Sequence, residues 1–131
     1  MPSTQRSLEE EEEIHHVLTR GVLRAFQFAF LHRGDVLTHY IGLTVYLGQL
    51  QGRPFDLSSL ASFTMLPRST VSRKLAELRP HIVLKGHHRK IATFEPKTPE
   101  QQHLTREYFL GLEKIFIETC QELAAARTRP Q

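Results

Sequence analysis

Apolar residues recur along most of the chain at the spacing of an α-helix, and polar residues between these series mark where each helix begins. The first series follows Ser7 and Glu10, which can form a capping box, and the glutamates at 9–13 suit the positive end of a helix dipole. Its apolar residues cover more than one stripe: Ile14, Val17, Leu18, Val22, Ala25, Phe26, Phe28, Ala29 and Phe30. We therefore expect a long helix over 7–33, with one face for the core and another for a partner, which favours a homodimer.

Three further helices are predicted before residue 80. A second series at helical spacing follows Asp35: Leu37, Tyr40, Ile41, Thr44, Leu47 and Leu50. Asp56 can cap a short third helix over 57–63, because its carboxylate can accept from the first backbone N–H groups. Pro67 suits the first turn of a fourth helix, which runs without a breaker to about Leu78.

The period of the apolar residues changes beyond Pro80. Residues 82–84 and 91–94 read as two short strands, joined by the basic tip KGHHRK at 85–90. Thr98 and Gln101 then give another capped start to a long amphipathic helix. The residues that recur at helical spacing along it are Leu104, Tyr108, Leu112, Ile115, Phe116, Thr119 and Leu123. We place this last helix at 98–126.

These elements predict a mainly α fold with a small β-hairpin wing. The arrangement of two short helices, a tight turn and a hairpin is that of a winged helix-turn-helix, here with long N- and C-terminal dimerisation helices at 7–33 and 98–126. The chain has 131 residues and 40% hydrophobic content, which is enough for one modest core. We expect residues 1–131 to form a single domain.

The fourth predicted helix divides into an apolar anchor and a polar display. Val71, Leu75 and Leu78 fall at i, i+4 and i+7 and share one face. The other positions carry Arg68, Ser69, Thr70, Ser72, Arg73 and Lys74. Such a helix lies with its N-terminal half in the major groove, where arginine reads guanine and short hydroxyls reach phosphates. We therefore predict these six side chains as DNA-binding residues.

Positive charge gathers in the same part of the chain. Between Arg53 and Lys97 there are nine Lys or Arg and three Asp or Glu, a balance of +6, whereas the other residues hold eight against eleven, or −3. Nucleic acid is the commonest polyanion for such a segment. The hairpin tip adds candidates for phosphate or minor-groove contact: Lys85, His87, His88, Arg89 and Lys90. Residues 36–97 are thus the predicted DNA-binding core, and double-stranded DNA the expected partner.

The segment SLASFTMLPRSTVSRKLAEL, with its flanking helices and hairpin, resembles the multiple antibiotic resistance regulator (MarR) family of bacterial winged-helix repressors. The order of elements is similar across nearly the whole chain, although Met65 stands where the family usually has a turn glycine. Ala61 and Val71 match its packing positions, and Arg68, Ser69, Thr70 and Arg73 match its DNA-facing positions. The resemblance implies a homodimer clamped by the terminal helices, one recognition helix per half-site, and often a small aromatic effector, for which no residues can be transferred.

Other chemistries find less support. No Ser, His and Asp grouping and no Gly-rich phosphate loop is present, so we do not expect an enzyme. The eight histidines include adjacent pairs at 15–16 and 87–88, but adjacent histidines point apart, and no cysteine or carboxylate stands at ligand spacing. Neither a metal nor a resident cofactor is expected. Cys120 lies in the last helix and reads as a small helix-face thiol.

The cysteine count and the hydropathy of the chain bear on its cellular location. A single cysteine excludes an intrachain disulfide framework, and no basic and apolar leader opens the sequence. No apolar run approaches the roughly 20 residues that span a bilayer. These features favour a cytoplasmic protein without a membrane partner.

The sequence thus predicts a sequence-specific, double-stranded-DNA-binding transcriptional regulator that acts as a homodimer, and the resemblance implies a repressor. One alternative stays open: a winged-helix adaptor whose basic segment meets an acidic protein. Sequence-selective binding would separate the two, because an adaptor need not prefer any duplex.

Overall fold

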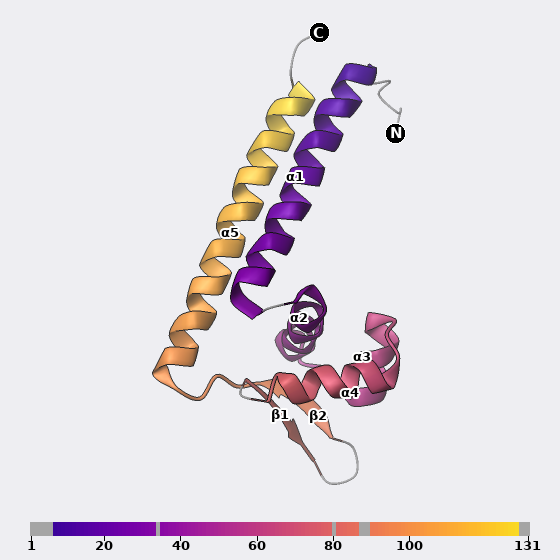
Figure 1. Ribbon diagram of the computed structural model, residues 1–131, viewed down its shortest axis with the longest axis vertical. Helices are drawn as coiled ribbons and strands as arrows, with labels where there is room; N and C mark the ends of the chain where they lie inside the picture. The colour runs from indigo at the N-terminus through magenta and orange to yellow at the C-terminus, as the bar shows by residue number, and fades with distance from the viewer. Residues whose placement is uncertain (1–6, 34, 80, 87–89, 129–131) are drawn as a thin grey trace. The chain divides into compact units, whose positions relative to one another are not determined.

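The computed structural model describes residues 7–33, 35–79, 81–86 and 90–128 and is mainly helical, with one two-stranded antiparallel hairpin (Figure 1). Its elements are α1 (Leu8–Arg33), α2 (Val36–Leu50), α3 (Leu57–Thr64), α4 (Arg68–Glu77), β1 (Ile82–Lys85), β2 (Ile91–Phe94) and α5 (Pro99–Thr128). This order confirms the predicted combination of a mainly α chain with a small hairpin. Several boundaries differ from the prediction by one or two residues: Pro67 is the N-cap of α4 and not part of its first turn, and α5 continues to Thr128.

The chain divides into two compact units. The terminal unit comprises the described residues up to Phe28 and from Glu107 onward, and the central unit comprises Ala29–Arg106. The central unit thus includes the whole segment 36–97 that the sequence singled out for its charge.

The core of the central unit joins α2, α3, α4 and the hairpin. Its buried side chains are Ile41, Val45, Leu60, Ala61, Val71, Leu75, Leu78, Ile82 and Ala92. The largest fully buried ones, Ile41, Leu60, Val45 and Val71, come from three helices. Burying each such side chain stabilises the fold by about 1.5–3 kcal/mol. The apolar positions predicted to anchor the fourth helix, Val71, Leu75 and Leu78, are therefore confirmed as core.

The hairpin is fastened to the core of the central unit along β2. Ile82 pairs with Phe94 and Lys85 with Ile91, and the backbone N–H of Ala92 donates to the carbonyl of Phe55 at 2.8 Å. The carboxamide of Gln49 extends the ladder, because its Oε1 accepts from the Phe94 N–H at 2.7 Å and its Nε2 donates to the Phe94 carbonyl at 3.3 Å. These bonds fix the hairpin relative to α2 and α3.

The terminal unit is an antiparallel pair formed by α1 and α5 (Figure 1). Ile14 and Val17, near the start of α1, pack with Ala126 near the end of α5. Farther along, the Phe28 ring lies against Gly111, where a Cβ would overlap it. Ion pairs link the same helices: Arg24 with Glu118, and Arg20 with Glu122. The Arg24 guanidinium, which bonds to Glu118, lowers the pKa of that carboxyl.

Long helices raise the question of membrane insertion. Within the described ranges, no helix combines the length and the apolar character that crossing a bilayer requires.

The turn between α3 and α4 contains a backbone conformation that glycine normally adopts. α3 begins with a full capping box, in which Asp56 accepts from the Ser59 N–H at 2.7 Å and the Ser59 hydroxyl accepts from the Asp56 N–H at 3.0 Å. It ends at Met65, with φ 61° and ψ 32° and a side chain 86% exposed. This left-handed conformation places the Met65 Cβ close to the following carbonyl oxygen, which costs a non-glycine residue about 1–2 kcal/mol.

Met65→Gly is expected to raise the free energy of unfolding by about 1 kcal/mol, because glycine adopts this conformation without the steric cost and little burial is lost. Urea unfolding followed by circular dichroism measures the change. Met65→Ala is the matched control, since it keeps the Cβ and should stay within about 0.5 kcal/mol of the wild type. A glycine variant no more stable than the alanine variant would show that the turn is not strained.

Candidate nucleic-acid interface

Helix α4 presents a polar face because its apolar face is held in the core. Val71 is 0% exposed, and Leu75 and Leu78 are each 5% exposed. On the other positions Arg68, Ser69, Ser72 and Arg73 are exposed, and Thr70 is half-buried. The predicted apolar anchor of this helix is thus confirmed, and four of the six side chains predicted to face outward are exposed.

The start of α4 is set by the end of α3. The Leu66 N–H donates to the Ala61 carbonyl at 3.2 Å, and the Tyr40 hydroxyl of α2 donates to the Thr64 carbonyl at 3.0 Å. Pro67 then occupies the N-cap of α4, where no side chain caps the first turn. The first backbone N–H groups of this helix are therefore left with the positive end of the dipole and no capping acceptor, an arrangement that suits an anion.

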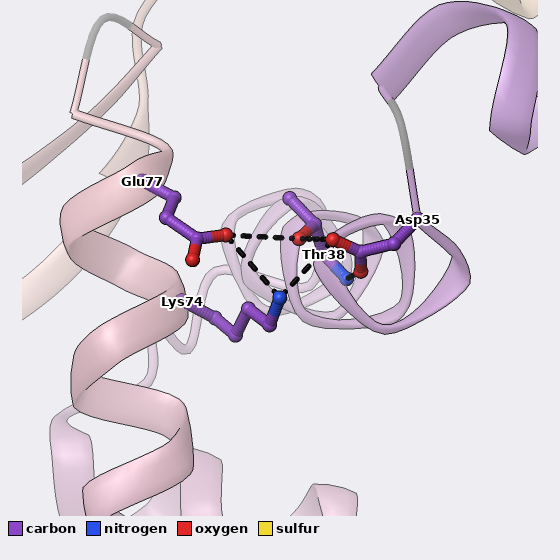
Figure 2. Close-up of polar contacts among 4 residues, drawn as sticks. All are labelled: Asp35, Thr38, Lys74 and Glu77. Carbon is purple, nitrogen blue, oxygen red and sulfur yellow. Dashed lines mark hydrogen bonds and ion pairs between the residues drawn. The ribbon is translucent and has the colours of Figure 1, made fainter.

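Lys74 differs from the other displayed side chains of α4 because two carboxylates bind it (Figure 2). Its Nζ lies 3.1 Å from Asp35 Oδ2 and 3.3 Å from Glu77 Oε2, and the side chain is only 14% exposed. The sequence grouped Lys74 with the residues that face outward, whereas the structure uses it to join α4 to the N-terminus of α2. The ammonium group of Lys74 is therefore less accessible than the guanidinium groups of Arg68 and Arg73.

Asp35 is both the N-cap of α2 and the partner of Lys74. Its Oδ1 accepts from the Thr38 N–H at 2.6 Å, and its Oδ2 lies 2.8 Å from the Thr38 hydroxyl. The Thr38 N–H is the main cause that lowers the pKa of Asp35 from 3.8 to about 2; the Thr38 hydroxyl and Lys74 lower it further, and burial opposes them. The same contact, from the other side, raises the pKa of Lys74.

The hairpin carries a second lysine that is held in an ion pair. Lys85 is exposed, but its Nζ lies 2.9 Å from Glu95 Oε2, and the Thr93 hydroxyl donates to Glu95 at 2.7 Å. The hydrogen bond from Lys85 is the main reason that the pKa of Glu95 is lowered. Lys90 is exposed at the start of the returning segment. The predicted tip residues His87, His88 and Arg89 lie outside the described residues.

All three acids of the cationic segment have partners inside the protein. Asp56 caps α3, Glu77 holds Lys74, and Glu95 holds Lys85. In the part of the chain that the structure describes, no carboxylate lies within ion-pair distance of Arg68 or Arg73. The Lys74–Glu77 pair was visible in the sequence as an i, i+3 spacing, but Asp35 is 39 residues from Lys74 and gave no such signal.

Two other observations bear on function. Over the ranges 7–33, 35–79, 81–86 and 90–128, no three His, Cys, Asp or Glu side chains gather as a metal site would require, and the Cys120 thiol is free and exposed. Comparison of the chain with protein-family models, curated proteins and solved structures gave no match. Function is therefore inferred from the surface that α4 and the hairpin expose.

The ionised Asp35 is expected to stabilise the protein above its ordinary pKa and to lose that effect as pH falls from about 4 towards 2, because its folded-state pKa is lowered to about 2. Asp35→Asn keeps an N-cap acceptor and removes the charge. Since the Asp35 side chain is 42% exposed, solvent screening limits the difference from wild type to about 1 kcal/mol at neutral pH.

Urea unfolding of both proteins between pH 2 and pH 7 measures this difference. Lys74→Met, which removes the ion pair and leaves the Thr38 bonds, should reduce the stability gap between the aspartate and asparagine forms. A gap that is constant with pH would assign the effect of Asp35→Asn to lost geometry and not to charge.

Proposed function

We propose that the protein is a sequence-specific DNA-binding transcriptional regulator of the winged helix-turn-helix type. In this proposal α4 is the recognition helix, the β1–β2 hairpin is the wing, and two copies act together. The observation that carries it is the face of α4 on which Arg68, Ser69, Ser72 and Arg73 are exposed while Val71 and Leu75 hold the helix in the core.

The arginine and hydroxyl side chains of that face are suited to binding a DNA duplex. Arginine donates two parallel hydrogen bonds to guanine O6 and N7, and short hydroxyls let the helix backbone approach the bases closely. The uncapped first turn of α4 adds N–H groups that favour a phosphate. A helix with a purely structural role has no need for two arginines that lack a carboxylate partner among the described residues, beside three hydroxyl residues.

The wing has a separate role in this proposal. Lys90 is exposed, whereas Lys85 is held by Glu95 and helps to fix the hairpin. Cations on a hairpin beside the recognition helix neutralise phosphates and carry little sequence information. The wing would therefore supply affinity, and α4 would supply preference.

A homodimer is proposed from the surface of the terminal unit. Its buried core is small, while large apolar side chains stay exposed on both helices: Leu18, Val22, Leu23, Phe26, Leu110, Phe116 and Ile117. Two helices cannot bury a face of this size between them, and a second copy of the same pair offers a complementary one. Two-fold symmetry would set the recognition helices about 34–36 Å apart, one turn of B-DNA.

The proposal also covers the direction of regulation, an effector and the location of the protein. The MarR resemblance favours repression and a small aromatic effector, and the single cysteine favours a cytoplasmic location. An adaptor that binds an acidic protein through the same basic face is the competing outcome. Selection of binding sites from random duplexes separates the two, because only the regulator enriches a sequence.

Arg73→Ala is expected to cost about 1–3 kcal/mol on the selected site and much less on random DNA, because a bidentate base contact is lost. Titration of labelled duplexes by fluorescence anisotropy measures both affinities. Lys74→Ala is the matched control from the next position, and because Asp35 and Glu77 hold Lys74, it should leave the preference unchanged. Equal losses on both duplexes for Arg73→Ala would make this arginine a phosphate contact.

The double variant Val22→Glu and Phe116→Glu should convert the dimer into monomers, because it places two charges on the apolar face proposed to be shared. Val22 is 52% exposed and Phe116 is 62% exposed. Light scattering should give a mass near twice the chain mass of 15.1 kDa for the wild type and near 15.1 kDa for the double variant. Gln102→Glu, an exposed change on α5 outside the terminal unit, is the control and should stay dimeric. A monomeric wild type that binds a palindrome at full affinity would contradict the proposed dimer.

A further inference from the structure

A groove of about 540 Å³ runs between α4 and the hairpin of the central unit. Leu75 and Ile82, both buried members of the core, form part of its floor. Arg79, Lys90 and Lys97 line it with cations, and Ser72 lies on its α4 side. Because Ser72 also belongs to the exposed face of α4, the groove is continuous with the proposed DNA-reading surface.

The three cations of the groove come from separate parts of the chain. Arg79 follows the C-terminus of α4, Lys90 precedes β2, and Lys97 precedes α5. All three side chains are exposed, and among the described residues none of the three has a carboxylate within ion-pair distance. The groove therefore concentrates positive charge that nothing in the described chain neutralises.

The nearby acids do not neutralise the positive charge of the groove. Glu77 and Glu95 do not line the groove, and each already binds a lysine outside it, Lys74 and Lys85 respectively. Lys97 contributes to lowering the pKa of Glu95, but only through its charge and after Lys85 and Thr93. An anion that enters the groove would thus meet three cations without displacing an existing ion pair.

We infer that this groove seats the sugar-phosphate backbone of one DNA strand, and that Arg79 and Lys97 are phosphate-binding residues. The inference rests on the proposed function, and it adds two phosphate contacts, from Arg79 and Lys97, that were not predicted from the sequence. A polyanion fits better than a small acid, because three cations on separate elements call for several charges, and each strand carries one per 3.4 Å of helix axis. The apolar floor suits the deoxyribose rings between the phosphates.

The double variant Arg79→Gln and Lys97→Gln tests the inference through the salt dependence of binding. Each lost phosphate contact lowers the slope of log K against log salt by about 0.9, so the slope should fall by about 1.8. The ratio of variant to wild-type Kd should consequently shrink by about twelvefold between 50 and 200 mM salt. The preference for the selected site over random duplexes should not change, because phosphate contacts carry no base information.

Two matched variants separate a site from a general charge effect. Arg106→Gln with Lys114→Gln removes the same charge from exposed residues of α5 that do not line the groove, and its slope should match the wild type. Arg79→Lys with Lys97→Arg keeps both charges and should keep the slope. Circular dichroism melting of each protein verifies that the exposed substitutions leave the fold intact.

Neutral methylphosphonate linkages locate the contact. Placed one at a time along the selected duplex, they should weaken wild-type binding at adjacent positions of one strand, and the glutamine double variant should lose nothing further there. An unchanged salt slope in that variant, or an equal drop in the α5 control, overturns the groove assignment while the regulator proposal stands. A wild type that binds no duplex at any salt concentration defeats both.

Discussion

The burial of Val71 between α2 and α3 is the constraint on which the exposed face of α4 depends. Val71 is fully buried in one cluster with Ile41 and Leu60, and this fixes the rotation of α4 about its own axis. Since side chains on a helix are spaced by about 100° per residue, fixing one position sets the direction of all others. Arg68, Ser72 and Arg73 are thus exposed as a consequence of core packing, and a polar residue at position 71 would disturb the core and the display together.

Ion pairing then decides which cations remain for a partner. Every acid of the cationic segment is engaged inside the protein, and two of them neutralise Lys74 and Lys85. Ion pairs whose carboxylates are as exposed as Glu77 and Glu95 contribute at most about 1 kcal/mol to stability. Their larger effect is to sort the basic side chains: some fasten α2, α4 and the hairpin, while Arg73 and the groove residues keep their full charge. Under the proposed function, this sorting separates residues that hold the surface from residues that bind through it.

The elements could be predicted from sequence because each depends on neighbours in the chain. Periodicity and capping residues such as Asp56 indicated the helices, and the alternation beyond Pro80 indicated the strands. The features that were not predicted depend on residues far apart in the sequence. They are the Asp35–Lys74 pair, the bonds from Gln49 to β2, and the position of Arg79 and Lys97 along one groove. A list of basic residues cannot tell a lysine that fastens two helices from one that stands free, since that difference lies entirely in tertiary contacts.

In the terminal unit, arginine and glutamate side chains are paired within the chain while many large apolar side chains stay exposed. Arg20 and Arg24 pair with Glu122 and Glu118 across the two helices, so the polar side chains of that seam are satisfied within one chain. The exposed apolar residues of the two helices are not covered within the terminal unit, and under the proposed function a second copy covers them. Joining two recognition helices raises affinity beyond that of either one, because the second helix binds at the high effective concentration set by the first. Under the proposed function, a single α4 has few side chains that could read bases and would depend on this pairing, so the dimer and the exposed face of α4 belong to one proposal.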